Sequence, residues 1–225
     1  MLTSATIAPM PPAAALFDND GLTLDTESAW TRAETALFAR HGKTFTMGHK
    51  HAMLGTSPQV SAVKLEAFLG RPGDELMAEL YEAVLEEVAA GIEPMRGAPE
   101  LLGALRAAGV PLALVSNSRK RFVELAIASA GLAETFDAIV TAEDVANPKP
   151  APDAYLAAAR QLGVEPAACV ILEDSPTGLA AARATGALTI GIPSLPGMTL
   201  DADLVAASLE DGAVWRALGL EAAAA

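Results

Sequence analysis

The sequence predicts an α/β protein: a Rossmann-like parallel sheet with helices on both faces, plus an inserted all-helical cap domain. Three observations predict this fold. Short apolar runs recur along the chain and end in polar loops, as buried parallel strands do. Helical patterns lie between the later runs, and strands alternating with helices form parallel sheets covered on both faces. A long segment after the first run has only helical patterns.

The first predicted strand, Ala13 to Phe17, is followed at once by Asp18-Asn19-Asp20-Gly21. Four further strands are predicted: Val110 to Val115, Ala138 to Val140, Ala168 to Leu172 and Leu188 to Ile192. Helices are predicted over Glu100 to Ala108, Arg121 to Ala130, Asp153 to Leu162 and Thr177 to Ala184. Each of these helices is followed within two residues by a glycine, the usual stop signal.

The helical insertion divides the chain into two predicted domains. Residues 1–26 and 94–225 form the sheet domain, and residues 27–93 form the helical cap inserted after the first strand. Within the cap, Leu76, Leu80, Val84 and Val88 recur at one-turn spacing. Two connections join the cap to the core, so we expect a hinge there. The alanine tail at the C-terminus is expected to fray.

Composition excludes several classes of function. The net charge of −13, with no run of Lys and Arg, argues against a nucleic-acid partner. Prolines interrupt the apolar N-terminal residues, and no uncharged apolar stretch is long enough to span a bilayer, so neither a signal peptide nor membrane association is expected. The single cysteine, Cys169, lies in an apolar run and is expected to be a buried thiol, which fits a cytoplasmic protein. No pattern indicates an oligomeric state.

Polar side chains cluster where the predicted strands end. Because the carboxyl ends of parallel strands meet at one edge of a sheet, we expect these side chains to converge there. They are Asp18, Asp20, Ser116, Asn117, Lys149, Glu173 and Asp174. Several carboxylates around one lysine favour a hard, oxygen-ligated cation, with Mg²⁺ the natural candidate. A phosphate could then sit between the ion, the Ser116 hydroxyl and the Lys149 ammonium, leaving a carboxylate for in-line attack.

Four segments resemble the motifs of the haloacid-dehalogenase-like (HAD) hydrolase superfamily, in the same order. Asp18-Asn19-Asp20-Gly21, followed by Asp25-Thr26-Glu27, is similar to the first motif, and Val115-Ser116-Asn117 to the phosphate-binding motif. Lys149-Pro150-Ala151-Pro152-Asp153 resembles the lysine motif, and Glu173-Asp174-Ser175 with Gly178 the acidic metal motif. One Asp-x-Asp motif alone would carry little weight, but four motifs at the ends of predicted strands make coincidence improbable.

The resemblance implies a role for each matched residue. Asp18 would be the nucleophile and a Mg²⁺ ligand, and Asp20 the general acid and base, with its backbone carbonyl on the metal. Asp174 would supply the remaining metal carboxylate, and Glu173 a direct or water-mediated contact. Ser116, with Asn117 beside it, would bind the transferring phosphoryl group, and Lys149 would stabilise both the phosphate and the nucleophile.

Neighbouring residues have simpler interpretations. Ser118 is expected to cap the helix that follows it, and Asp153 to be a first-turn acid of its own helix. The pair His49-x-His51 does not face one way on a helix, so solvent exposure or substrate contact is favoured over zinc binding.

The position of the cap resembles that in phosphoglycolate-phosphatase-like and β-phosphoglucomutase-like members, which implies a phosphatase acting on a small phosphorylated metabolite. A sugar phosphomutase is the first alternative. Trp30 stands where the mutases commonly have a histidine, and Pro58 stands near Gly55-Thr56-Ser57, where they supply an arginine; Lys50, Lys64 or Arg96 would have to replace it. The alternative from another class is a non-catalytic protein that binds a phosphorylated metabolite.

Overall fold

The computed structural model describes residues 11–53, 58–194 and 197–221. Contacts between residues divide the chain into two compact units. One unit comprises Met1–Leu24 with Glu93–Ala225 and contains a sheet, and the other comprises Asp25–Ile92. Each unit is described by itself. None of the helices in the described ranges is long and apolar enough to cross a membrane.

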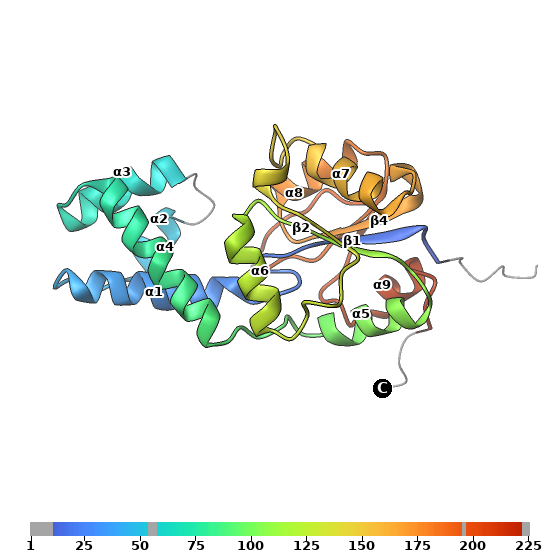
Figure 1. The fold of residues 1–225 in the computed structure, drawn as a ribbon, viewed down its shortest axis with the longest axis horizontal. Coiled ribbons are helices and arrows are strands. Elements are labelled where there is room, and N and C mark those ends of the chain that lie inside the picture. Colours follow the sequence, from blue (N-terminus) through green and yellow to red (C-terminus); the bar gives the residue numbers. More distant parts are fainter. Residues whose placement is uncertain (1–10, 54–57, 195–196, 222–225) are drawn as a thin grey trace, which may run out of the picture. The chain divides into compact units, whose positions relative to one another are not determined.

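The sheet unit contains six strands in the order β3-β2-β1-β4-β5-β6, and every neighbouring pair is parallel (Figure 1). Their bounds are β1 Ala14–Asp18, β2 Leu112–Val115, β3 Ala138–Val140, β4 Cys169–Glu173, β5 Leu188–Gly191 and β6 Leu204–Val205. The three central strands, β2, β1 and β4, are buried along their whole length, which explains their continuous apolar sequences.

The helices of this unit are α5 Ala98–Ala107, α6 Lys120–Ser129, α7 Asp153–Leu162, α8 Pro176–Arg183 and α9 Gly212–Ala217. The strand order reverses direction at β1: the chain moves outward from β1 through β2 to β3 and then returns to β4 on the other side. Right-handed crossovers therefore place α5 and α6 on one face and α7 and α8 on the other. Figure 1 shows α7 and α8 on one side of the sheet, with α5 and α9 opposite.

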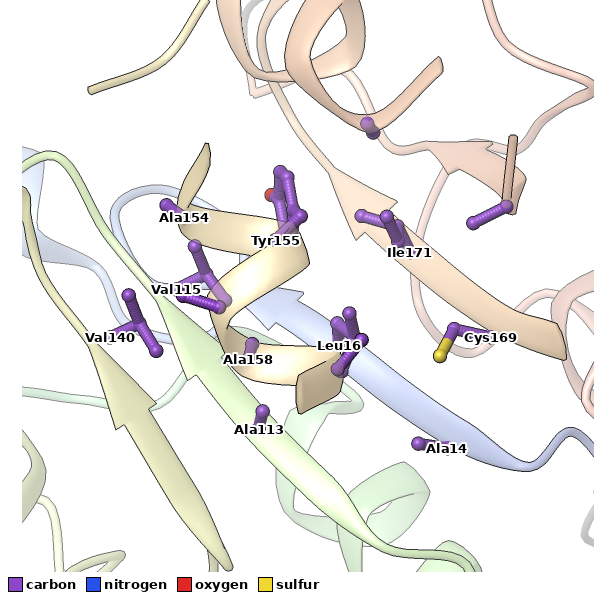
Figure 2. Close-up of a cluster of buried hydrophobic side chains, with 14 of the residues drawn as sticks. Ala14, Leu16, Ala113, Val115, Val140, Ala154, Tyr155, Ala158, Cys169 and Ile171 are labelled. Carbon is purple, nitrogen blue, oxygen red and sulfur yellow. The ribbon is translucent and has the colours of Figure 1, made fainter. Parts of the chain in front are cut away.

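The core beneath α7 is built largely from small side chains. Ala154 and Ala158 of α7 pack against Ala113 and Val115 of β2 and Leu16 of β1 (Figure 2). Cys169 belongs to the same cluster and is 2% exposed, as expected for a structural thiol. Alanines on the inner face of a helix let it approach the sheet closely, which explains why the buried face of α7 is rich in alanine.

The described residues of the second unit form helices only: α1 Thr26–Arg40, α2 Met47–Met53, α3 Pro58–Leu69 and α4 Gly73–Ala90. The periodic residues Leu76, Leu80, Val84 and Val88 are all buried on α4. His49 lies among aromatic rings: its ring centroid is 4.7 Å from those of Phe38 and Phe68, and its Nδ1 accepts from the Thr46 amide. Its contacts within this unit are those of a packing residue.

The predicted α/β fold class is confirmed, and the predicted strands and helices of the sheet unit lie within two residues of those observed. Gly163, for example, ends α7 in the left-handed conformation that favours glycine, with φ 70°. Neither β6 nor α9 was predicted, because a two-residue strand and a six-residue helix are too short to show a period. The alanine tail, residues 222–225, lies outside the described residues, as do Gly55, Thr56 and Ser57.

Candidate active site

The sheet brings the predicted site residues together at the carboxyl ends of the central strands. Asp18 is the last residue of β1 and Glu173 the last residue of β4. In register, Asp18 pairs with Val115, the residue before Ser116, and Phe17 pairs with Leu172, the residue before Glu173. β1 is also where the strand order reverses, the position at which open α/β sheets bind ligands.

Lys149 lies at the centre of this cluster, with its side chain only 3% exposed. Its ammonium group lies 2.5 Å from Asp18 Oδ1, 2.8 Å from Glu173 Oε1 and 2.9 Å from the Val115 carbonyl oxygen. An ammonium group has three protons, so each proton has its own acceptor. Burial alone would lower the pKa of Lys149, but Asp18 and Glu173 raise it above its ordinary value. The lysine is therefore charged and held in a single position.

Glu173 is the second carboxylate that contacts Lys149, and it has no exposed surface. Its Oε1 accepts from Lys149 and, at 2.7 Å, from the hydroxyl of Tyr155 on α7. Its Oε2 accepts from the backbone amides of Asp174 and Ser175 and from the Ser175 hydroxyl. Both oxygens are thus occupied within the protein, which favours a positioning role for Glu173 over direct metal ligation.

Gly178, in the first turns of α8, leaves the space that Glu173 occupies. A Cβ atom at this position would lie 1.7 Å from Glu173 Oε1 and 2.1 Å from Oε2. The glycine backbone therefore allows the helix to begin directly against the buried carboxylate. The hydroxyl of Ser175 caps the same helix by accepting from the Gly178 amide at 3.0 Å.

Asn117 fixes the backbone of the loop that carries Lys149. Its Nδ2 donates to the Lys149 carbonyl oxygen at 3.0 Å, and its Oδ1 accepts from the Lys149 amide at 2.9 Å. Both functional groups of the Asn117 side chain are used in this pair, so the side chain couples the loop after β2 to the loop before α7. This contact supports a positioning role rather than direct phosphate binding by the Asn117 amide.

The carboxylate of Asp20 is held by three side-chain donors. Its Oδ2 accepts from Ser116 Oγ at 2.7 Å and from Ser118 Oγ at 3.0 Å, and its Oδ1 accepts from Asn19 Nδ2 at 3.2 Å. The expectation that Ser118 caps the following helix is wrong. Arg119 occupies the N-cap of α6, and the amide of Lys120, the first residue of that helix, donates to Glu143 Oε2 at 3.3 Å and not to Ser118.

The donor set fits a hard divalent cation. One carboxylate oxygen from each of Asp18, Glu173 and Asp174 lies within 4.8 Å of the others, and all three residues are buried. Burial raises the pKa of Asp18 well above its usual range, against the effect of Lys149. Burial also raises the pKa of Asp174 to about 7, although a hydrogen bond with Ser194 opposes the shift. The single lysine leaves this buried negative charge incompletely balanced, which a cation such as Mg²⁺ would correct.

Asp18 and Asp174 are the carboxylates that fit such an ion best, because those of Glu173 are already occupied. Asp174 lies against the turn that carries Asp20: a Cβ atom on Gly21 would be 2.7 Å from Asp174 Oδ2. Gly21 has φ 84°, a conformation that side chains with a Cβ rarely adopt. A glycine at this position therefore both permits the turn and lets the acidic loop approach it.

Tyr155 was not singled out from the sequence, yet its side chain takes part in this network. The hydroxyl is the only polar group on the buried face of an alanine-rich helix, and that pattern could have drawn attention to it. Its ring centroid lies 4.7 Å from Lys149 Nζ, and its hydroxyl donates to Glu173. Burial, followed by the charge of Glu173, raises the pKa of Tyr155 well above its usual value, so the hydroxyl keeps its proton.

This fold and this group of residues define a parallel α/β enzyme whose carboxylates and lysine meet at the strand-order reversal. Within that class, the chain belongs to the haloacid dehalogenase-like hydrolase family, whose sequence pattern matches residues 12–186. It is 33% identical over 194 residues to the validoxylamine A 7'-phosphate phosphatase of Streptomyces hygroscopicus subsp. limoneus, covering 85% of this chain and 89% of that protein. It is also 31% identical over 175 residues to the fructose-1-phosphate phosphatase YqaB of Escherichia coli, covering 76% and 91%.

Solved structures show the same relationship. The phosphate complex of CbbY from Rhodobacter sphaeroides aligns with a TM-score of 0.74 and 28% identity, covering 88% of this chain and 95% of that one. A family member from Deinococcus radiodurans, with bound phosphate and sodium, aligns with a TM-score of 0.78 and 30% identity over 96% of this chain. The family, and the phosphatase activity of its named members, make this chain a HAD-like phosphatase.

We predict that Gly178→Ala disrupts the site. The added methyl group has to displace Glu173, which leaves Lys149 without one of its acceptors; we expect a loss of more than about 2 kcal/mol of unfolding free energy. Phosphatase activity should fall with it. Urea unfolding and turnover of an aryl phosphate measure both effects.

Gly103→Ala on α5 is the matched control. A Cβ atom there meets nothing within 4 Å, so the substitution should stabilise the protein by roughly 0.5–1 kcal/mol and leave turnover unchanged. If the Gly178 variant were as stable and active as the control, the packing described for Glu173 would be wrong.

Proposed function

We propose that this phosphatase hydrolyses a small phosphorylated metabolite, of the phosphosugar or phosphoglycolate type, through a phosphoaspartyl intermediate on Asp18. The observation that carries the proposal is the buried contact between Lys149 and Asp18 at the end of β1, with Ser116 on the adjoining strand end. The relatives act on phosphate monoesters: their names specify validoxylamine A 7'-phosphate and fructose 1-phosphate. The substrate of this chain is proposed only as a class.

In the proposed first step, an oxygen of Asp18 attacks phosphorus in line with the leaving oxygen. Lys149 holds the other oxygen of Asp18 and stabilises negative charge on the phosphoryl group, while the Ser116 hydroxyl donates to a phosphoryl oxygen. Asp20 gives its proton to the leaving oxygen as the bond to phosphorus breaks. In the second step Asp20 takes a proton from water, which attacks the phosphoaspartate and regenerates Asp18.

Mg²⁺ is the proposed cofactor, held by Asp18, Asp174 and the backbone carbonyl of Asp20. Its charge would neutralise the phosphate oxygens and the carboxylates together. We propose a cytoplasmic location, as the single buried cysteine indicated. The assignment of residues 27–93 as a substrate-selecting cap also remains a proposal.

The sugar phosphomutase is the alternative, and the contacts of the three candidate replacement cations weigh against it. Lys50 Nζ is held between two glutamates, at 2.9 Å from Glu27 and 3.2 Å from Glu34. Lys64 donates to the carbonyl oxygen of Ala52. Arg96 pairs with Glu210, although this exposed pair is weak and could be exchanged. Two of the three cations therefore have buried or backbone partners that would have to be given up to bind a second phosphate.

We predict that Asp18→Asn abolishes turnover while the fold is retained, because the amide has nearly the same shape but cannot act as an anionic nucleophile. Phosphate release from p-nitrophenyl phosphate, together with circular dichroism, is the measurement. Glu100→Gln on α5, which changes an exposed first-turn acid outside the site, should leave turnover unchanged. Residual activity of Asp18→Asn within about tenfold of the wild type would contradict the assignment of the nucleophile.

Metal removal gives a second prediction. Activity should disappear in chelator, return with Mg²⁺ and be inhibited by Ca²⁺, whose longer and looser coordination misplaces the attacking carboxylate. Mg²⁺ at about 100 times its dissociation constant should also stabilise the fold by roughly 2.7 kcal/mol. Asp174→Ala should lose that shift in melting temperature, whereas Asp201→Ala, which removes an exposed carboxylate, should keep it. Full activity in chelator would rule out the metal.

A third prediction separates hydrolase from mutase. A hydrolase phosphoenzyme should transfer its phosphoryl group to water, so hexose 1-phosphates should release free phosphate without a bisphosphate primer. Phosphate and hexose 6-phosphate are followed together, with and without a trace of the matching hexose bisphosphate. Isomerisation faster than phosphate release would replace the proposed hydrolase with the mutase, although the Asp18 chemistry would stand.

A further inference from the structure

The hydroxyl of Ser118 is not used by the helix that follows it. α6 begins at Lys120, its N-cap Arg119 makes no capping hydrogen bond with its own side chain, and the Lys120 amide donates to Glu143. Ser118 Oγ instead donates to Asp20 Oδ2 at 3.0 Å, across 98 residues of sequence. The side chain thus contacts the carboxylate that the proposed function makes the general acid and base, and secondary structure does not account for that contact.

Ser116 contacts the same oxygen of Asp20, but in the proposed reaction its hydroxyl also has to donate to a phosphoryl oxygen. Its hydroxyl lies 2.7 Å from Asp20 Oδ2, and its oxygen accepts from the Ser118 amide at 2.9 Å. A hydroxyl group has one proton to donate. Ser116 therefore cannot donate to Asp20 and to a phosphoryl oxygen at the same time. When the Ser116 hydroxyl donates its hydrogen bond to phosphate, Ser118 remains as the side-chain donor to Asp20 Oδ2.

We propose that Ser118 is a positioning residue for the phosphatase reaction: its hydroxyl holds the Asp20 carboxylate while the Ser116 hydroxyl donates a hydrogen bond to the transferring phosphoryl group. The inference rests on the proposed function, since it takes Asp20 as the acid and base. Asn19 Nδ2, at 3.2 Å from Oδ1, holds the other oxygen of the same carboxylate. The acid thus stays anchored at both oxygens after the substrate has displaced one of its donors.

The consequence falls on proton transfer to the leaving group. As Asp18 bonds to phosphorus, the bond from phosphorus to the leaving oxygen breaks and the Asp20 proton passes to that oxygen. General acids contribute most when they are held within hydrogen-bond reach of the accepting atom. A leaving group that is stable as an anion needs little of this help, whereas a more basic one depends on it. Loss of the Ser118 hydroxyl should therefore lower the rate more for a substrate with a basic leaving group than for one whose leaving group is stable as an anion.

The experiment compares the wild type, Ser118→Ala and Ser118→Thr in Mg²⁺, with p-nitrophenyl phosphate and phenyl phosphate as substrates. kcat/KM is the readout, because it reports the steps up to departure of the leaving group. For Ser118→Ala we expect kcat/KM on phenyl phosphate to fall by roughly 10- to 100-fold, the range that one hydrogen bond to an ionised group can contribute. The fall on p-nitrophenyl phosphate should be much smaller. Ser118→Thr keeps a hydroxyl and should retain the wild-type ratio between the two esters.

Ser129→Ala on α6 is the matched control, since it removes a serine hydroxyl that donates only within its own helix, to the Ala126 carbonyl oxygen. It should leave both rates unchanged.

An equal loss of kcat/KM on both esters in Ser118→Ala would mean that Ser118 contacts the substrate or has a general structural role, and would overturn the proposal. No loss on either ester would also overturn it. A wild type inactive on both esters would overturn the proposed function and the Ser118 role together, whereas an active wild type with an unchanged ratio in Ser118→Ala would overturn only the latter.

Discussion

The buried ammonium group of Lys149 is the interaction on which the rest of the site depends. A charge this deeply buried is tolerated only where it is paired and fully hydrogen-bonded, and all three of its protons have acceptors. Those acceptors come from β1, β2 and β4, the three central strands of the sheet. The lysine thus links the ends of strands that are far apart in sequence, and its position requires that all three be correctly paired.

Several features outside the reacting groups follow from this constraint. Glu173 must lie beside Lys149, and Gly178 in the first turn of α8 leaves room for its carboxylate. Tyr155 must stay protonated to donate to Glu173, and burial on α7 ensures that it does. Asn117 holds both the backbone amide and the carbonyl oxygen of Lys149. These residues need never touch a substrate, yet removing any of them would free the lysine to move.

Asp20 is held in a different way, with a consequence for catalysis. Lys149 has buried partners that a substrate would not displace. Asp20 accepts from the hydroxyl groups of Ser116 and Ser118, and in the proposed reaction the Ser116 hydroxyl donates to the phosphate instead. Asp18, the proposed nucleophile, therefore lies in a buried charged network. Asp20, the proposed acid, lies in a network whose hydrogen-bond partners can change. This division suits a reaction in which Asp20 must first give up a proton and later take one back.

The sequence alone determined the parallel α/β fold and the set of polar residues at its strand ends. Apolar runs that end in polar loops are local patterns, and the carboxyl ends of parallel strands must meet at one edge of the sheet. Asp18, Asp20, Ser116, Lys149 and Asp174 could therefore be named in advance as neighbours. The helical character of residues 27–93 was equally local, because one-turn spacing is visible within a single helix.

Only the tertiary structure decided what each polar atom contacts. Ser118 looked like a helix cap from its place in the chain, and Asn117 and Glu173 looked like ligands for phosphate and metal. Their partners lie between 18 and 98 residues away in the sequence, or across a turn whose geometry the sequence does not specify. A hydrogen bond depends on ångström-scale distances between side chains from separate elements, and those distances are set by packing, not by the pattern of any one segment.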